Sequence, residues 1–230
     1  MSILINPHRF IIPSAAASVT RIGITTAVLS SLTTTVTFSS VAVGAADVTR
    51  RVIVFIGGFC SSPSPPKNIV SATIGGVSAT MDVISSHSGS AQAAIASAPL
   101  AAGTTATITV TFSGATYGGC YITVFRAVDL TSGTPFDTAS AAPTTGTAQS
   151  VTIDKQAGGI VVAGANSYQV GSDSYTMTGL TNSLRTDLGG VQRQMAGWED
   201  SASTASGQTV TVDVTGPDPN YSALVAAAYR

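Results

Sequence analysis

The sequence predicts an all-β protein, folded as an antiparallel two-sheet β-sandwich of the jelly-roll kind with an extended N-terminal arm. Residues 106–112 alternate apolar residues with threonines, which is the two-residue period of a half-buried strand. The same pattern recurs at residues 34–38 and 209–214. About a dozen expected strands, some alternating and some apolar on both faces, follow one another at the spacing of roughly 8–12 residues that is typical of sandwiches. No stretch has the helical period over more than two turns.

The composition indicates a surface with little charge. The chain has 230 residues, of which ten are basic and eleven acidic, so charged residues make up 9% and the net charge is −1. Globular proteins carry about 25% charged residues. Weak electrostatic repulsion between copies favours association, so we expect an assembled protein. The length fits one large β domain, and we expect an arm and linker over residues 1–18 and a single sandwich domain over 19–230.

The same composition argues against two classes of partner. The basic residues are scattered, without the stripe that binds nucleic acid or the polybasic patch that binds anionic lipid. The longest apolar runs, such as residues 51–56, are far shorter than the roughly 20 residues of a membrane-spanning helix. We therefore expect neither nucleic acid nor a membrane as a partner.

Residues 1–13 are apolar but carry two prolines. Proline lacks an N–H donor and restricts the residue before it, so this segment is expected to be an extended arm rather than a central strand. Its docking partner is either its own domain or a neighbouring subunit. The assembly contacts expected of the arm are those of Ile3, Ile5, Pro7, Phe10 and Ile12.

In the first half of the domain we expect a strand pair at residues 19–28 and 34–43. Residues 50–56 are apolar on both faces, which indicates a central strand that the glycines at 57–58 end. The later elements are a hairpin of 68–74 and 77–84 around Gly75-Gly76, a strand or helical turn at 91–98, a strand at 104–112, a glycine-rich turn at 113–119 and a strand at 121–128.

The second half begins with a long loop, expected over residues 130–150 and rich in Thr, Ser, Ala, Gly and Pro. Strands of the same character then resume. They are expected at 151–153, 160–165, 174–178, 191–198, 209–214 and 221–229, the last apolar enough to be buried.

Residues that carry chemistry are sparse, so we expect no enzyme and no cofactor. His8 lies in the arm and His87 in a loop, and no Gly-x-Ser-x-Gly elbow presents a nucleophile. Glu199 and Asp200 are adjacent, and neighbours on a strand point to opposite faces, so they do not converge as an acid and base. We expect Trp198 in the core, followed by two solvated acids. No Cys-x-x-Cys, His-x-x-x-His or Asp-x-Asp pattern indicates a metal.

The two cysteines, Cys60 and Cys120, are too few for a disulfide scaffold. Three states stay open: two unpaired thiols, one internal bridge, or bridges between copies. Cys60 is the better candidate for a bridge between copies, because a proline-rich loop follows it.

Two stretches resemble a known class of proteins. Residues 5–10, Ile-Asn-Pro-His-Arg-Phe, resemble the Asn-Pro-Tyr-Arg-Phe openings of tailed-phage virion proteins, with His8 at the tyrosine position. Residues 38–165 are similar to a β-sandwich domain of phage and prophage proteins. The stretches that carry this similarity are 47–57, 70–77, 103–114, 134–138 and 157–164.

This resemblance implies a component of a phage particle: a capsid decoration, neck or collar, or tail-associated protein. The implied partners are other copies of the chain and other virion proteins of the portal, connector, capsid or tail. The implied location is the virion. The resemblance carries over no catalytic residue, and neither cysteine belongs to its pattern.

Two functional hypotheses follow from the sequence. The first is a virion structural protein that assembles in symmetric copies through its arm and its weakly charged surface. The alternative is a carbohydrate-binding sandwich, on a virion fibre or secreted, that stacks sugars on exposed aromatic rings. Its candidate rings are Tyr117, Tyr168 and Tyr175, which lie in or near loops.

Overall fold

The fold is all-β, as expected. The computed structural model describes residues 15–60, 67–87, 91–141, 148–168, 174–187, 192–215 and 222–230. Within these ranges the chain forms fifteen strands and no helix, and every strand pair is antiparallel. The strands form sheets of seven, five and three strands, which is more than the two sheets of a simple sandwich.

The first half of the chain builds the seven-stranded sheet, in the order β4-β3-β7-β2-β6-β5 with β1 also paired to β7. Its strands are β1 (Ser18–Ala42), β2 (Arg51–Cys60), β3 (Ile69–Ile74), β4 (Val77–Ser78), β5 (Thr80–His87), β6 (Ala91–Pro99) and β7 (Thr105–Val128).

The second half builds the other two sheets, in the orders β12-β13-β10-β15-β8 and β11-β14-β9. Its strands are β8 (Asp137–Ala141), β9 (Ala148–Lys155), β10 (Ile160–Tyr168), β11 (Ser174–Thr178), β12 (Asn182–Asp187), β13 (Gln192–Asp200), β14 (Ala205–Thr215) and β15 (Ser222–Tyr229). The expected loop over 130–150 therefore contains β8 and the start of β9, and β12 is a strand that the sequence did not indicate.

Two long strands, β1 and β7, pair with each other from Ser18 opposite Val128 to Ala42 opposite Thr105. The expected strand pair at 19–28 and 34–43 is wrong, because these residues form one continuous strand. The expected turn at 113–119 is also wrong, because it lies inside β7. Both strands bend at their middles, where the register shifts. Residues 113–119, which are rich in glycine and were expected to form a turn, lie at this bend instead.

The bend folds the seven-stranded sheet over on itself around a first core. One layer of the folded sheet carries β3 together with residues 33–42 of β1 and 105–116 of β7, which we call the outer halves of these strands. The other layer carries β2 and β6 together with residues 118–128 of β7, its inner half. Alternate residues of both layers point inward. The period-2 pattern at 106–112 is therefore confirmed, because Ile108 and Val110 are buried while Thr107 is exposed. This core contains Val36, Phe38, Val54, Ile56, Ile74, Ala96, Phe112 and Ile122 among others.

A second core joins the two halves of the chain. The opposite face of β2, β6 and the inner half of β7 packs on one face of the five-stranded sheet. A third core lies between the other face of that sheet and the three-stranded sheet. The second core includes Ile53, Phe55, Ile95, Phe125, Val162 and Val225, and the third includes Val161, Ile153, Met177, Val210 and Leu224.

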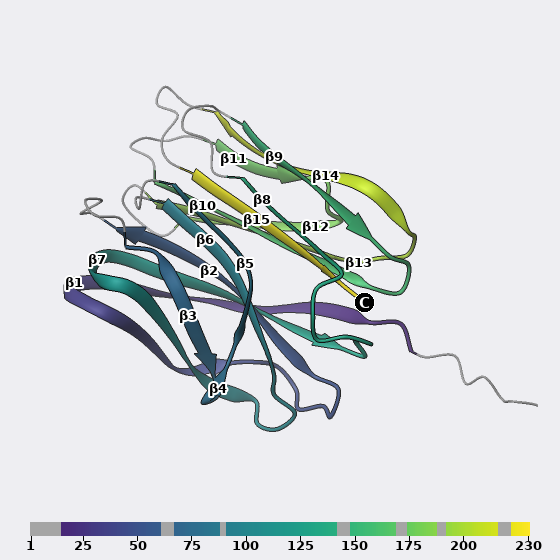
Figure 1. Cartoon of the computed structure of the whole chain (residues 1–230), viewed down its shortest axis with the longest axis horizontal. Helices are drawn as coiled ribbons and strands as arrows, with labels where there is room; N and C mark the ends of the chain where they lie inside the picture. Colours follow the sequence, from purple (N-terminus) through teal and green to yellow (C-terminus); the bar gives the residue numbers. More distant parts are fainter. Residues whose placement is uncertain are drawn as a thin grey trace, which may run out of the picture.

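The result is a stack of four β layers with a core between each neighbouring pair (Figure 1). The layer of β3 and the outer halves of β1 and β7 lies at one end of the stack, and β9, β11 and β14 lie at the other. Strands inside the stack are covered on both faces. All eight residues of β15 and the first eight of β6 are buried, and the expected central strand at 50–56 lies inside the stack.

The glycine pairs have two different roles. Gly75 and Gly76 form the expected hairpin turn, with φ values of 61° and 80° that favour glycine. The expectation that residues 57–58 end a strand is wrong, because β2 runs on to Cys60. There a Cβ on Gly58 would lie 3.3 Å from the Phe112 ring, so glycine lets the strand continue in a crowded core.

A buried arginine ties loops at one end of the stack. Arg50 is 1% exposed. Its Nε donates to the carbonyl of Leu100 at 2.5 Å, Nη1 donates to Gly44 and Ala45 at 2.8 and 3.0 Å, and Nη2 donates to Ala102 at 2.7 Å. The loops before β2 and after β6 are held together by these four bonds, which satisfy a buried cation without a carboxylate in contact.

We expect Gly164→Ala to destabilise the protein, because a Cβ at this position would lie 2.2 Å from the Phe55 ring across the second core. Overpacking of this kind costs about 1–3 kcal/mol. Denaturant unfolding followed by circular dichroism measures the loss. Gly23→Ala is the control, since a Cβ there meets no atom within 4 Å. Equal stability of the two variants contradicts the close approach of Phe55 to Gly164.

Candidate functional site

The outer surface of the first layer is an uncharged array of hydroxyl groups. Thr35 of β1 lies opposite Thr111 of β7, which lies opposite Ser71 of β3, and the next row repeats the arrangement. In that row Thr37 and Thr109 approach to 3.5 Å between their hydroxyl oxygens. We call this surface the first hydroxyl face; it consists of Thr35, Thr37, Ser71, Thr73, Thr107, Thr109 and Thr111.

The opposite end of the stack carries a second surface of the same kind. Thr211 of β14 lies between Thr178 of β11 and Ser150 of β9, with a 2.8 Å hydrogen bond between the hydroxyls of Ser150 and Thr211. We call this the second hydroxyl face; it consists of Ser150, Thr152, Thr176, Thr178, Thr209 and Thr211. Asp213, which is exposed opposite Thr176, adds one carboxylate at the edge of this face. Both ends of the four-layer stack therefore present mainly threonine and serine where globular proteins commonly place charge.

Local chemistry explains these faces. Threonine is β-branched and fits a pleated surface, and facing threonine pairs stabilise neighbouring strands. Hydroxyls recur at about 4.8 Å between strands and about 6.7 Å along each strand, which are the spacings of a β-sheet. The sequence pattern indicated the threonine alternation, but the pairing of β1, β3 and β7 brings it together as a surface.

The two cysteines lie on neighbouring strands, β2 and β7. Cys120 lies opposite Gly58, and Cys60 lies opposite Gly118, so the two are offset by two residues. Such diagonal neighbours are about 7–8 Å apart, longer than most disulfides span. Cys120 is a free, buried thiol, and burial raises its pKa, which keeps it protonated and unreactive. The side chain of Cys60 lies outside the described residues, and its bridge between copies stays a prediction.

The assembly residues expected of the arm, Ile3, Ile5, Pro7, Phe10 and Ile12, lie outside the described residues, as does His8. His87 ends β5, where its backbone pairs with Ala91, and its side chain is likewise outside the described part. Among the residues that are described, no three His, Cys, Asp or Glu side chains gather as a metal site. The described chain also contains no helix long and apolar enough to cross a membrane.

The acids next to Trp198 point to opposite faces, as expected, but they differ in environment. Trp198 packs against the second core and lies 5.9 Å from Phe125 between ring centroids. Asp200 is exposed, and its carboxylate accepts a 2.7 Å hydrogen bond from the backbone N–H of Val19. The expectation of a solvated Glu199 is wrong, because this side chain is buried between the second and third sheets.

Glu199 is held by a full set of donors. Lys155 Nζ lies 2.7 Å from Oε1, Gln208 Nε2 donates to the same oxygen at 3.1 Å, and Thr181 donates to Oε2 from its N–H and hydroxyl. Burial by itself would raise the pKa of Glu199, but the bonds from Lys155, Gln208 and Thr181 hold that pKa below its usual value. The carboxylate therefore links β13 to β9 and β14 through an ion pair and hydrogen bonds.

A second carboxylate joins the first sheet to the second. Asp82 of β5 accepts hydrogen bonds on Oδ2 from the Ser97 hydroxyl and, at 2.7 Å, from the Tyr229 hydroxyl. Arg51 donates in turn to the Ser97 hydroxyl at 2.9 Å. Burial raises the pKa of Asp82 despite these bonds, and burial together with the Asp82 charge raises that of Tyr229. This chain of groups links the edge of the folded sheet to the last strand.

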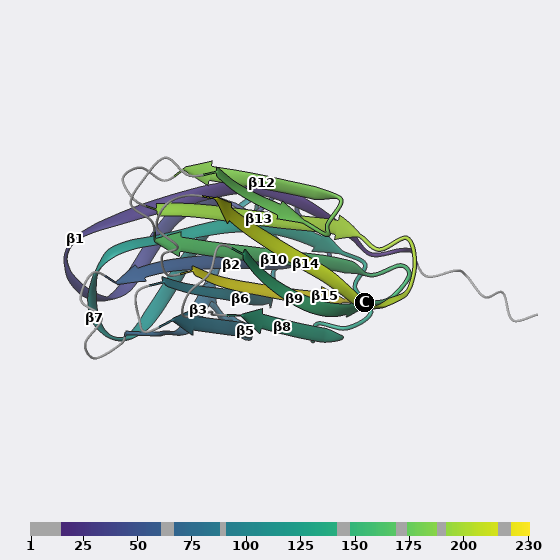
Figure 2. The ribbon, with the colours of Figure 1, turned by 90° about the horizontal axis from the view of Figure 1, so that it is seen from above.

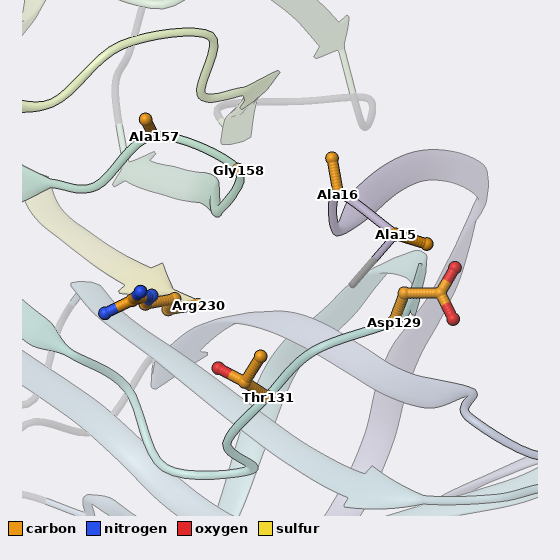
Figure 3. A pocket seen from close by; sticks show the side chains of 7 residues that line it. All are labelled: Ala15, Ala16, Asp129, Thr131, Ala157, Gly158 and Arg230. Atoms are coloured by element: carbon orange, nitrogen blue, oxygen red, sulfur yellow. The ribbon is translucent and has the colours of Figure 1, made fainter. Parts of the chain in front are cut away.

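The pocket of Figure 3 lies where the chain leaves β7 and β15. It has a volume of about 210 Å³ and is lined by Ala15, Ala16, Asp129, Thr131, Ala157, Gly158 and Arg230. The Asp129 carboxylate and the Arg230 guanidinium point away from each other (Figure 3). The lining therefore presents small apolar walls and one threonine, without a converging acid and base.

One of the three tyrosines considered for sugar binding is buried. Tyr175 is 2% exposed in the third core, where burial raises its pKa to about 12. Its ring cannot stack on an external sugar. The side chains of Tyr117 and Tyr168 lie outside the described residues.

We expect Glu199→Gln to lower stability by roughly 3 kcal/mol at neutral pH, because it leaves Lys155 without its charge partner in a buried site. The folded pKa of Glu199 lies below its unfolded value, so its stabilising effect is present above the unfolded pKa and is lost as the pH falls through the folded one. Unfolding free energies measured from neutral to acid pH should therefore converge for wild type and variant.

Asp200→Asn is the matched control, because Asp200 is the neighbouring acid on the exposed side and Asn still accepts the Val19 bond. A constant difference between wild type and Glu199→Gln at every pH contradicts the role given to the ionised carboxylate.

Comparisons of the chain with models of protein families, with curated proteins and with solved structures found no match. A functional proposal for this chain therefore depends on its own surfaces and contacts.

Proposed function

We propose that this chain is a structural protein that assembles in multiple copies through protein–protein contacts. The observation that carries the proposal is the presence of an ordered face rich in hydroxyl groups at each end of the four-layer stack, uncharged in the first face and with the single exposed carboxylate of Asp213 beside the second. With a net charge of −1, long-range repulsion between copies is weak.

The side chains of the two faces suit docking. Threonine has few rotamers, so it loses little conformational freedom when a partner covers it, whereas lysine or glutamate loses more. Each threonine presents a methyl group for packing and a hydroxyl that donates and accepts hydrogen bonds. The first hydroxyl face can be covered by a second sheet without burying an unpaired charge, because none of its residues is charged.

The resemblance to phage proteins extends the proposal to a virion. In this reading the chain is a neck or collar, capsid-decoration or tail-associated protein, and its partners are other copies and the portal, connector, capsid or tail. The two layers around the first core are proposed to be the jelly-roll-like sandwich that the strand pattern indicates. No residue of this chain is given a catalytic role.

We expect charge on the hydroxyl faces to weaken assembly. The double variant Thr109→Lys/Thr211→Lys places a cation at the centre of each face, where desolvating it in a contact is costly. Light scattering after size exclusion should show smaller assemblies than wild type at equal concentration. Val48→Lys is the control, because Val48 is 92% exposed in the loop between β1 and β2 and belongs to neither face. If the double variant and the control assemble alike, the faces are not contacts.

We expect deletion of residues 1–13 to abolish incorporation into particles while the sandwich still folds, because the apolar arm docks on a neighbour. Circular dichroism checks folding of the truncated chain, and mass spectrometry of purified particles checks incorporation. Normal incorporation of the truncated chain would show that the arm is not required.

A further inference from the structure

Strand β1 has one paired edge and one edge without a strand. This strand of 25 residues pairs with β7 along its length, with interruptions at the register shifts, and no other described strand pairs with it. It lies along one side of the molecule, opposite the side that carries β5 and β8 (Figure 2). A free strand edge presents a row of N–H and C=O groups that pair readily with another chain.

Several positions along this edge carry protective features. A register shift separates Arg21 from Gly23, Arg21 itself is charged, and further shifts follow between Leu29 and Thr33 and between Phe38 and Val41. Bulges and charges of this kind are the usual means of keeping edges from pairing.

The stretch from Gly23 to Leu29 lacks these features, and we call it the open edge segment. Its seven residues pair with β7 in unbroken register, from Gly23 opposite Val124 to Leu29 opposite Gly118. The segment contains no charged residue and no proline. Thr26 is exposed and the Val28 side chain is 78% exposed, so the edge is accessible beside uncharged, β-branched side chains.

We propose that the open edge segment pairs antiparallel with the same segment of a second copy, about a two-fold axis through Thr26. This inference rests on the proposed function and names one contact of the assembly. In this register Ile24 lies opposite Val28 of the second copy and Thr26 lies opposite Thr26, all on one face of the joined sheet. β-Branched residues thus meet β-branched residues, and Arg21 falls outside the pairing.

A second copy fits this edge better than an unrelated strand for two reasons. An antiparallel pair of identical segments is self-complementary, which is the requirement of a two-fold interface. The absence of charge from residues 23–29 means that no like charges face each other across the axis. The contact would join two seven-stranded sheets into one continuous sheet through main-chain hydrogen bonds.

The test uses opposite charges at Thr26. Thr26→Lys and Thr26→Glu each place two like charges face to face at the axis, so each variant alone should self-associate about ten-fold more weakly than wild type or worse. An equimolar mixture of the two should recover the dimer as a heterodimer, measured by sedimentation velocity. Thr34→Lys is the control, since Thr34 is exposed on the same strand outside the open edge segment.

Hydrogen exchange of the wild type gives a second measurement that needs no variant. Amides of residues 23–29 should exchange more slowly at high than at low protein concentration. If wild type assembles but neither Thr26 variant weakens it, or the mixture recovers nothing, the edge contact is wrong and the proposed function stands. If wild type is monomeric at every concentration, both the edge contact and the proposed function are wrong.

Discussion

Burial of strands on both faces is the constraint on which this architecture depends. The residues of β6 and β15 are mostly apolar on both faces and nearly all buried, so each strand needs a layer above and a layer below. A two-layer sandwich covers only one face of each sheet. The chain meets the requirement with four layers, and the second core, where the Phe55 ring lies on Gly164, joins its two halves.

Polar side chains inside the stack join separate elements rather than forming a reaction centre. Arg50 ties two loops, Glu199 and Lys155 tie the second sheet to the third, and Asp82 and Tyr229 tie the first sheet to the second. Arg50, Glu199 and Tyr229 are buried and Lys155 and Asp82 are partly buried, and each is bonded, so desolvation is offset by direct contacts. Several of the few charged side chains of this protein therefore link elements of the interior.

The outer surfaces were predictable in composition but not in extent. Alternation at residues 106–112 correctly placed Thr107 outward and Ile108 inward, because strand geometry alone sets which side chains share a face. Which strands lie beside β7 depends on pairings across more than 70 residues, such as Thr37 with Thr109. The hydroxyl faces and the open edge segment exist only through those pairings.

The sequence by itself determined that the chain is all-β, where most strands lie and which of their residues face inward, because these properties follow from neighbours along the chain. The tertiary structure decided the rest. It made one bent strand of residues 18–42, continued β7 through an apparent glycine-rich turn, and buried Glu199 beside Lys155. The physical reason is that bending, pairing and burial depend on partners distant in sequence, which no local pattern records.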